Sequence, residues 1–464
     1  MDKYYAGDYN YGKYHGCRYL GNKFLGACLM KLNKKVTILV GFAFLAISAF
    51  WQMYDNLIPL ILKNTFNMNE TITGVIMAAD NVLALFLLPL FGSISDRTNC
   101  RMGKRKPFIL FGTLAAVSLM TFIPILDNSY YAVSSKAKLI GFIVLLGFIL
   151  IVMGTYRSPA VALMPDVTPK PLRSKGNAVI NLMGALGGII YLVATTFMYP
   201  KSKTEGLAHI NYQPIFTVVS IVMLVALIII LFFVNEPKLR AKQLEYEKAH
   251  PEQDLTSESS CEDHLSVEKR KLPRAVKRSL IFLLLSVALW FAGYNAVTTW
   301  FSTYATTVWG MALGDANFCF TIAMAGAIVC YLPAGLVAGK IGRKKTILFG
   351  AGLLAVCFGV AFVYTLFASS FHPALYALFV LIGVAWASIN VNSLPMVVEM
   401  CSGADMGKFT GYYYTFSMAA QTATPVLSGF LISKLSYQTL FPYAAIFVAA
   451  SFMTMCFVRH GDSK

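Results

Sequence analysis

Twelve stretches of the chain are each long and apolar enough to cross a bilayer, and this feature constrains the fold more than any other. A helix needs about 20 apolar residues to span the hydrocarbon core. The stretches cover residues 36–62, 71–95, 107–126, 138–165, 176–199 and 213–234 in the first half, and residues 279–308, 314–338, 346–367, 373–400, 409–433 and 439–458 in the second. The sequence therefore predicts a multi-pass helical membrane protein.

The composition excludes most other classes of protein. Of the 464 residues, 57% are hydrophobic and only 13% are charged, about half the charged share of a soluble domain. A soluble enzyme, a nucleic-acid-binding protein or a disordered chain could not hide so much apolar surface. The nine cysteines occur singly, without a CxxC pair or a Cys/His cluster, so we expect neither a disulfide framework nor a metal site.

The basic residues predict the orientation. If the N-terminus is cytoplasmic, 32 of the 39 Lys and Arg residues lie in cytoplasmic segments and 6 lie in outer loops. Because basic loops stay inside, we expect both termini to be cytoplasmic in a multi-pass protein of the cell membrane. The tail 1–35 shows no signal peptide. The same bias explains the net charge of +17 without a nucleic-acid partner.

A long polar loop divides the spans six and six. We expect an N-terminal tail (1–35), a first six-helix bundle (36–234), a cytoplasmic linker (235–278), a second bundle (279–458) and a C-terminal tail (459–464). The linker is too short and too polar for a folded domain, although Lys238–Glu247 is predicted to be helical.

The two halves repeat three features in the same order, which indicates a duplicated unit. A Tyr-Asp or Tyr-Asn pair follows a tryptophan in spans 1 and 7, a Gly-rich basic loop follows spans 2 and 8, and a Pro with a nearby acid ends spans 4 and 10. The features are Trp51 with Tyr54-Asp55, Trp290 with Tyr294-Asn295, the loops from Gly92 to Lys106 and from Gly335 to Lys345, Pro165-Asp166, and Pro395 with Glu399.

The two loops resemble the hallmark of the major facilitator superfamily, G-x-x-x-[D/G]-[R/K]-x-G-[R/K]-[R/K]. The copy from Gly335 fits cleanly, and the copy from Gly92 fits once about five residues are inserted before Gly103. This resemblance implies an all-α membrane protein with twelve transmembrane helices in two six-helix bundles, the major facilitator fold. It also implies a secondary active transporter rather than an enzyme.

Spans 2 to 5 are similar to the glycoside/cation symporters and their sucrose/proton relatives. The similarity rests on the loop from Asp96 to Phe108, on the segments 157–166 and 173–178, and on the glycines of 184–188. The coupling sites of those families do not carry over, because Ala84 and Leu88 stand where the sodium-coupled members have two carboxylates. These departures leave the coupling ion open. We expect a proton, with sodium as the alternative ion, and no cofactor.

Three charged residues lie well inside the spans: Asp55, Asp80 and Arg157. An ionised side chain at the bilayer centre costs about 2.5–3.5 kcal/mol on insertion scales, so each needs a partner or a function. Asp55 and Asp80 are candidates for the proton-coupling carboxylate. Alternatively, Asp55 is a hydrogen-bonding residue beside Asn56, and Asp80 pairs with Asn81. Arg157 could hold substrate hydroxyls or form a structural ion pair.

Sugar sites combine an aromatic ring with converging amides and hydroxyls. The candidates for substrate binding are Trp51, Gln52, Tyr54, Asn56, Tyr156, Asn177, Asn181, Tyr294, Asn295, Trp386, Asn390, Tyr413 and Gln421. The mid-span amides could instead bond between helices. Trp300, Tyr304 and Trp309 are expected in the aromatic belt at the membrane interface.

The basic loops are candidates for gating. Asp96 could cap the next helix or pair with an arginine, Gly92 and Gly335 could allow close helix packing, and Asp166 and Glu399 could pair with the loop cations. The alternative is that these cations only enforce topology. The full gating set is Gly92, Asp96, Arg97, Arg101, Arg105, Asp166, Gly335, Gly339, Arg343 and Glu399.

We therefore expect a monomer in the lipid bilayer that moves a small hydroxylated solute, a sugar or glycoside, by alternating access with proton symport. A drug or organic-anion exporter of the same fold is the first alternative. A receptor or membrane enzyme is the second, although the chain contains no HExxH, GxSxG or P-loop pattern.

Overall fold

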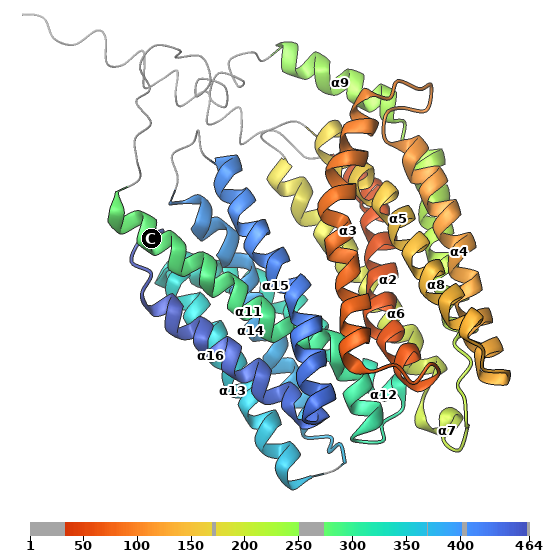
Figure 1. Cartoon of the computed structure of the whole chain (residues 1–464). Helices are drawn as coiled ribbons and strands as arrows, with labels where there is room; N and C mark the ends of the chain where they lie inside the picture. Colours follow the sequence, from red (N-terminus) through yellow and green to blue (C-terminus); the bar gives the residue numbers. More distant parts are fainter. Residues whose placement is uncertain (1–32, 169–172, 250–272, 369, 401–405, 462–464) are drawn as a thin grey trace, which may run out of the picture.

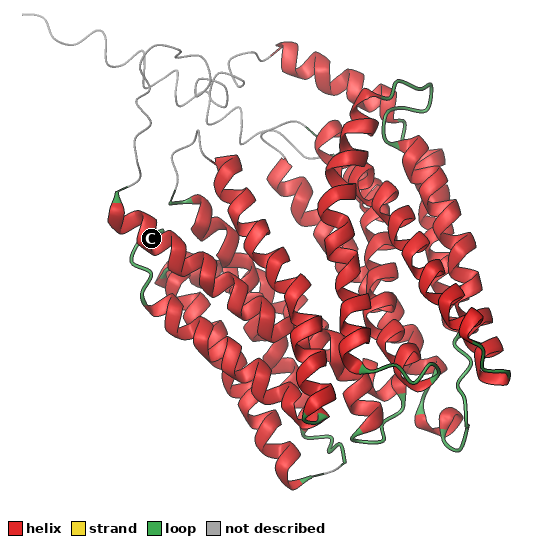
Figure 2. Cartoon of the chain, viewed as in Figure 1, coloured by secondary structure: helices red, strands yellow, loops and turns green. Residues whose placement is uncertain are grey.

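The computed structural model describes residues 33–168, 173–249, 273–368, 370–400 and 406–461. Within them the secondary structure is helical (Figure 2). The helices of the first half are α2 (Lys34–Asn64), α3 (Glu70–Arg97), α4 (Lys106–Ala132), α5 (Lys136–Val167), α6 (Arg173–Met198), α7 (Lys201–Thr204) and α8 (Gln213–Phe233), followed by α9 (Glu236–Ala249). Those of the second half are α11 (Arg274–Thr307), α12 (Leu313–Ile341), α13 (Arg343–Phe367), α14 (Leu375–Val398), α15 (Met406–Lys434), η3 (Tyr437–Thr439) and α16 (Leu440–Cys456).

The twelve-helix prediction is confirmed, and most helix ends extend a few residues beyond the apolar stretches. Among the described helices, eleven are long and apolar enough to cross a membrane, and α15 is the twelfth long helix. For example, α11 begins at Arg274, whereas the apolar stretch begins at residue 279. Backbone hydrogen bonding sets the helix ends, so polar residues at the membrane surface remain helical.

Helix α15 is more polar than the other eleven long helices of the bundle, and it lies between the two halves. It packs mainly against α3 of the first half and α11 of the second. Its hydroxyls donate to carbonyls of the same helix, as Thr424 does to Ala420 at 2.6 Å and Ser428 does to Thr424 at 2.6 Å. These bonds satisfy the hydroxyl groups where water is scarce.

Each half has its own hydrophobic cluster. The first contains buried residues from Val40 to Val234 together with Leu313, and the second contains buried residues from Leu280 to Val458. Between the halves, α3 packs against α15, α6 against α12, and α2 against α11. Figure 1 shows these central helices flanked by the others.

The aromatic residues at the end of α11 correct one prediction. Trp300, Tyr304 and Trp309 are expected in the interfacial belt, yet they belong to the buried cluster of the second half. Trp300 donates from Nε1 to the Ser428 hydroxyl at 3.0 Å, and Tyr304 meets the Trp309 ring edge-on. The prediction was wrong because composition alone does not separate a lipid-facing tryptophan from one packed between helices.

The two ends of the molecule differ. The α9 end carries α9 and the loop 98–105, and the α7 end carries α7 and the loop 65–69. Helix α9 confirms the predicted helical segment around Lys238–Glu247. The ribbons of the two halves lie close together near the α7 end and farther apart toward the α9 end (Figure 1). Among the described residues, every hydrogen bond between the halves lies toward the α7 end.

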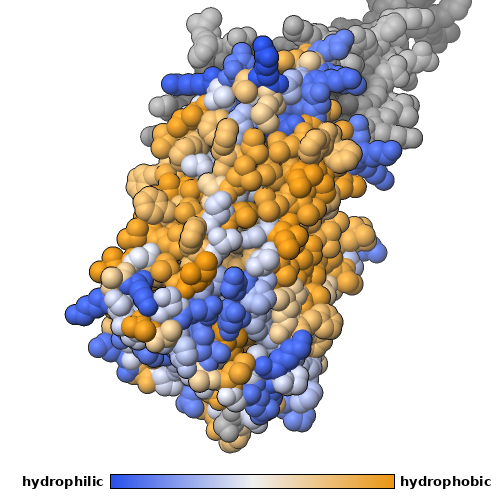
Figure 3. All heavy atoms as spheres, turned by 90° about the vertical axis from the view of Figure 1, so that its right-hand side faces the viewer, coloured by the Kyte–Doolittle hydropathy of each residue, from blue (hydrophilic) through white to orange (hydrophobic). Residues whose placement is uncertain are grey.

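Large apolar side chains face outward. Phe111, Phe232, Val329 and Phe367 are each at least 70% exposed, and Figure 3 shows a broad apolar band between two hydrophilic ends. A soluble monomer rarely exposes so much apolar surface. In a lipid bilayer this apolar surface contacts the hydrocarbon core and not water, which agrees with the predicted multi-pass membrane protein.

Candidate functional site

A cavity of about 370 Å³ lies between the two halves, near the middle of the membrane helices. Its walls come from α2, α3 and α5 of the first half and from α11 and α15 of the second. The lining residues are Phe44, Ile47, Ser48, Trp51, Asp55, Met77, Asp80, Asn81, Arg157, Val161, Asn295, Thr298, Thr299, Gln421 and Pro425. All three embedded charges predicted from the sequence therefore meet in one cavity.

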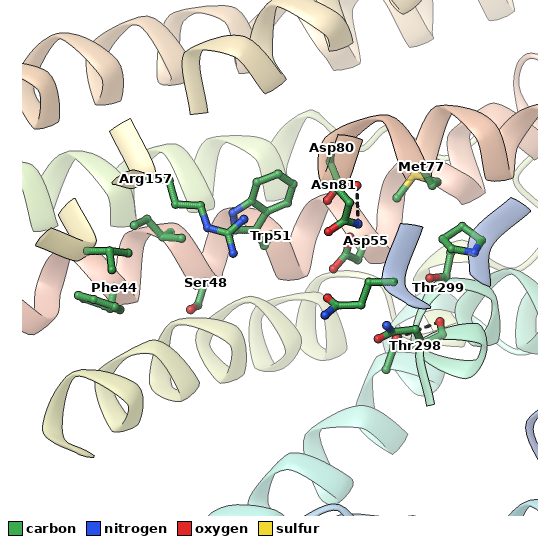
Figure 4. A pocket seen from close by; sticks show the side chains of 15 residues that line it. Phe44, Ser48, Trp51, Asp55, Met77, Asp80, Asn81, Arg157, Thr298 and Thr299 are labelled. Atoms are coloured by element: carbon green, nitrogen blue, oxygen red, sulfur yellow. Dashed lines mark hydrogen bonds between the residues drawn. The ribbon is translucent and has the colours of Figure 1, made fainter. Parts of the chain in front are cut away.

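The charged side of the cavity belongs to the first half. Asp55 on α2 and Asp80 on α3 lie near each other, with Arg157 of α5 reaching toward them (Figure 4). Arg157 interacts electrostatically with both carboxylates, but within the described residues it forms no salt bridge. The structural ion pair considered for Arg157 is therefore not formed in this state.

Arg157 is held by an aromatic ring instead. Its Cζ atom lies 5.4 Å from the centroid of the Trp51 ring, within the range of a cation–π contact. The Trp51 ring also meets Phe50 and Tyr54 edge-on, at centroid distances of 5.2 and 5.5 Å. The ring is thus fixed between its own helix and the guanidinium.

The two carboxylates differ in their hydrogen bonding. Asp80 accepts a bond from Asn81 Nδ2 at 2.8 Å, the pairing considered for it from the sequence. No hydrogen bond to the Asp55 side chain is found among the described residues, although its carboxylate faces the cavity. Asp55 is therefore the acid with more capacity to accept a proton or a donor from a bound solute.

The second half contributes neutral polar groups to the cavity: Asn295, Thr298 and Thr299 of α11, and Gln421 of α15. Among the described atoms, Asn295 Nδ2 and Trp51 Nε1 are buried donors without a partner. An unpaired buried donor costs roughly 1–3 kcal/mol. A bound solute, water or another conformation of the protein must therefore supply acceptors for these groups.

Four predicted residues on the first half do not line the cavity. Tyr54 is buried against Phe50, Tyr156 donates from its hydroxyl to the Ala43 carbonyl at 3.0 Å, and Gln52 places Oε1 close to Gly188 of α6. Asn56 is buried, and its Oδ1 accepts a bond from the Ser302 hydroxyl of α11 at 2.8 Å. Adjacent positions on a helix face different neighbours, so a polar run such as 51–56 cannot all point into one cavity.

Asn177 and Asn181 are exposed and also lie outside the cavity lining. They share the α6 face that carries Gly184 and Gly188. An added Cβ on Gly184 would lie 3.0 Å from the Ser48 hydroxyl, so this face points toward the cavity side of α2.

The predicted residues of the second half divide in the same way. Asn295 and Gln421 line the cavity, whereas Tyr294 stacks on Trp386 with centroids 3.9 Å apart. Tyr413 is buried with its hydroxyl 2.9 Å from that of Ser393, and Asn390 is exposed outside the lining.

Nine lining residues were not predicted: Phe44, Ile47, Ser48, Met77, Asn81, Val161, Thr298, Thr299 and Pro425. Helical spacing could have found Phe44 and Ser48, because residues 44, 48, 51 and 55 share one face of α2. The same spacing extends the Asn295 face of α11 to Thr298 and Thr299.

A charged cluster at the α9 end joins the loop 98–105 to α3 and α5. The guanidinium of Arg105 bonds to Asp96 and Ser95 of α3, and to Asp166 of α5 at 2.7 Å. Burial lowers the pKa of an arginine, but the bonds to Asp166 and Asp96 outweigh this effect and raise the pKa of Arg105. Arg105 thus remains charged and ties α3 to α5.

Glu236, which the sequence analysis did not single out, caps α4. Its carboxylate accepts bonds from the backbone N–H groups of Lys104, Arg105 and Lys106 at 2.6–3.1 Å. These are free donors at a helix N-terminus, where an anion is favoured. Glu236 begins α9, so the cap connects α9 to the charged loop.

The second loop carries an ion pair of its own. Arg343 at the start of α13 pairs with Glu399 after α14, while Arg97 and Arg101 of the first loop are exposed. Gly92 lies close to Ser158, but a Cβ on Gly335 would only contact Val391 at 3.6 Å. Gly339 has open space around it, so close packing does not require glycine at either position of the second loop in this state.

The described residues contain no group of three or more His, Cys, Asp or Glu side chains placed to hold a metal ion. The cavity is therefore defined by its carboxylates, its arginine and its amides.

Comparison with known proteins identifies the family. The family profile described as Major Facilitator Superfamily matches residues 40–314 and 306–464. The sucrose transport protein SUC3 of Arabidopsis thaliana is 24% identical over 207 residues, which make up 40% of this chain and 34% of that protein. The match spans about a third of that relative's length.

Solved structures share the fold. The xylose transporter XylE from E. coli, in an inward open conformation, has a TM-score of 0.63 at 15% identity, covering 93% of this chain and 96% of that one. The nucleoside transporter NupG has a TM-score of 0.62 at 13% identity, covering 92% of this chain and 100% of that one. At these identities the likeness shows the fold alone.

Proposed function

Since the chain belongs to the major facilitator superfamily of secondary transporters, we propose that it carries a small hydroxylated solute, a sugar or glycoside, together with a proton. The observation that carries the proposal is the single cavity in which two carboxylates and an arginine of one half face neutral amides and hydroxyls of the other. Solute and proton would be bound there in turn.

The cavity chemistry supports a neutral, hydroxylated solute. Its volume of about 370 Å³ falls within the usual range for small-molecule sites. Amide and hydroxyl groups both donate and accept hydrogen bonds, as a sugar requires. Two carboxylates outnumber one arginine, so the cavity disfavours an organic anion, the alternative cargo. The similarity to a sucrose transport protein also supports a sugar as the cargo.

The embedded carboxylates support proton coupling. A carrier whose cavity changes access must avoid moving an unbalanced charge through the apolar barrier. Protonation of Asp55 or Asp80 leaves one carboxylate to balance Arg157. Sodium remains the alternative ion, because carboxylate and amide oxygens are also its ligands.

The charge distribution supports the orientation proposed here. The cluster of Arg105, the pair of Arg343 with Glu399, and α9 all lie at the α9 end, which we assign to the cytoplasm. Both termini then lie in the cytoplasm of a monomer in the cell membrane. Residues 36–234 and 279–458 act as the two moving bundles, and 235–278 as the linker.

The contacts between the two halves indicate which side of the cavity is closed in this structure. The hydrogen bonds between the described parts of the two halves lie toward the α7 end, so the cavity is sealed from that side. In the proposed orientation this is a state closed to the outside, and the transport cycle must separate the halves at the α7 end.

Uptake by the purified protein in proteoliposomes tests the proposal. Radiolabelled mono- and disaccharides, glycosides, an organic anion and a hydrophobic cation should be compared with and without an inward proton gradient, and protein-free liposomes serve as the control. We expect saturable, gradient-driven accumulation of at least one sugar or glycoside. Accumulation of the anion or the hydrophobic cation alone would contradict the proposed cargo.

A further inference from the structure

A buried acid at the α7 end lies outside the transport cavity. Asp127, in the last two turns of α4, is 0% exposed, and both of its carboxylate oxygens lack a hydrogen-bond partner among the described residues. Thr65, at the end of α2, interacts with the carboxylate without a hydrogen bond of normal geometry. A buried carboxylate ion without partners is very unfavourable, so this group needs a proton or a cationic neighbour.

One ionisable side chain that can become a cation reaches Asp127. His209, in the loop between α7 and α8, places Nε2 at 3.7 Å from Asp127 Oδ2. Its side chain is 15% exposed, so protons from water at this end can reach the pair through the imidazole. Tyr212 of α8 also interacts with Asp127, but a neutral phenol cannot balance the charge of the carboxylate.

The charged groups of the neighbouring elements have other partners. Lys63 of α2 pairs with Glu70, and Lys201 of α7 pairs with Glu205. Lys138 of α5 donates to two backbone carbonyls at the end of α4, at 2.8 and 3.0 Å. Within the described part of the chain, the only ion-pair contact of the buried acid is therefore the one with the histidine.

Hydrogen bonds around His209 fix which ring nitrogen carries the hydrogen. The backbone N–H of Gln213 donates to Asn211 Oδ1 at 2.9 Å, and Asn128 Nδ2 donates to the same oxygen at 2.9 Å. Asn128 therefore turns its Oδ1 toward His209 Nε2, which lies 2.9 Å away. Because a carbonyl oxygen only accepts hydrogen bonds, Nε2 carries a hydrogen, and the lone pair of the neutral ring is on Nδ1.

The same contacts attach the loop to the end of α4 (Figure 1). Asn128 of α4 bonds to both His209 and Asn211 of the loop. Tyr131, about one turn further along α4, stacks on the His209 ring with centroids 4.3 Å apart. The loop thus forms part of the cover over Asp127, and the covering side chain can itself gain a proton.

We propose that Asp127 and His209 form a proton-binding site at the α7 end, separate from the transport cavity, and that the bound proton fastens the loop 205–212 to α4. With the proton, the pair is an imidazolium beside a carboxylate or an imidazole beside a carboxylic acid, and neither form buries an unbalanced charge. Without the proton, the carboxylate must gain water, and the loop that excludes water must move. This inference goes beyond the proposed function, because it requires neither the sugar nor coupling by Asp55.

Two effects on the imidazole oppose each other. Burial lowers the pKa of His209, whereas the carboxylate of Asp127 and the ring of Tyr131 favour a cation at this position. We therefore assign the proton to the pair, whose two groups titrate together, and not to one residue. The site responds to the pH at the α7 end, which is the outer face in the proposed orientation.

Hydrogen exchange in the loop tests the site. The full-length protein in lipid nanodiscs is followed by mass spectrometry between about pH 5 and 8, with rates corrected for the intrinsic pH dependence of amide exchange. The segment 207–216 is monitored because it includes the Gln213 N–H bonded to Asn211. One proton changes the closed-to-open ratio by at most about tenfold per pH unit, and we expect exchange to rise about tenfold across the whole range.

Two variants separate the site from general effects of pH. Asp127→Asn has no charge to balance, so its loop should stay protected across the range. Glu205→Gln is the matched control, because it removes an exposed acid at the start of the same loop, and it should behave as the wild type does.

The ring signals of His209 give a second measurement. In protein labelled with ¹⁵N-histidine, His209→Gln identifies the signal among the six histidines. We expect the Nε2–H tautomer at high pH and a transition between about pH 5 and 8. In Asp127→Asn this transition should disappear or move about one pH unit lower or more, because the carboxylate is absent.

An identical His209 transition in the wild type and in Asp127→Asn, or an equal pH dependence of loop exchange in these two proteins, would overturn the site. If Asp127→Asn is poorly folded, the wild type alone still decides, since ring signals and loop exchange that do not change over this range would contradict the proposal. Both measurements are made without sugar or a proton gradient, so a failure of sugar transport would refute the cargo and leave this site intact.

Discussion

The guanidinium of Arg157 lies over the ring of Trp51, with Cζ 5.4 Å from the ring centroid, and forms no salt bridge with a described carboxylate. The positive charge in the cavity is therefore held by an aromatic face, while Asp55 and Asp80 remain without a fixed ionic partner. This arrangement leaves the acids free to respond to a proton or a solute.

Arg157→Lys should reduce transport by about tenfold or more, because a lysine is a strongly hydrated point charge and does not reproduce the planar stacking on Trp51. The maximal uptake rate and the half-saturating concentration should be measured in proteoliposomes. Arg278→Lys is the matched control, since Arg278 lies over the Phe282 ring at 5.6 Å, away from the cavity. Normal transport by Arg157→Lys would refute a role for the stacked guanidinium.

The helices could be predicted from the sequence because the length of an apolar stretch is a local property. The twelve stretches and the helical segment of the linker follow from composition over a window. Other features depend on residues more than a hundred positions apart. Examples are the packing of α3 against α15 and the hydrogen bond from buried Trp300 to Ser428. No local pattern contains that information.

The candidate site could be predicted in part. The cost of burying charge identified Asp55, Asp80 and Arg157, which all line the cavity. Polar neighbours in the same run were not separable by residue type, since Asp55 faces the cavity and Asn56 faces Ser302. Glu236 was missed because its partners are backbone N–H groups, which leave no trace in the residue pattern.

Asp96→Asn should slow transport several-fold while leaving the equilibrium affinity for substrate within about threefold, because Asp96 pairs with Arg105 at the α9 end and does not line the cavity. Binding can be followed by calorimetry and transport by uptake. Glu205→Gln, which removes an exposed pair with Lys201, should change neither. A well-folded Asp96→Asn protein that fails to bind substrate would contradict the gating assignment.

Glu236→Gln should lower the free energy of unfolding by roughly 1–3 kcal/mol, because it removes the negative charge that accepts three backbone N–H groups at the start of α4. The apparent melting temperature in detergent would report the loss. Glu245→Gln is the control on the exposed side of α9 and should have no effect. Equal stability of the two variants would show that the cap contributes little.

Reporter fusions test the proposed orientation. The charge bias predicts that the C-terminus at Lys464 and the linker near Ser259 are cytoplasmic. A reporter that is active only in the cytoplasm should be active at both sites, and a reporter that is active only after export should be inactive. An active exported reporter at either position would overturn the assigned topology.

Of the two cavity carboxylates, we propose that Asp55 rather than Asp80 couples proton binding to transport, because Asp80 already accepts a hydrogen bond from Asn81. The measurement is made on one preparation of the Asp55→Asn protein: uphill accumulation of the identified sugar under a proton gradient, and exchange of labelled for unlabelled sugar without one. We predict that accumulation is abolished and exchange persists, because asparagine keeps a polar side chain in the cavity but cannot bind and release the proton, while Asp80→Asn has the smaller effect. An Asp55→Asn protein that still concentrates the sugar against its gradient would contradict the account.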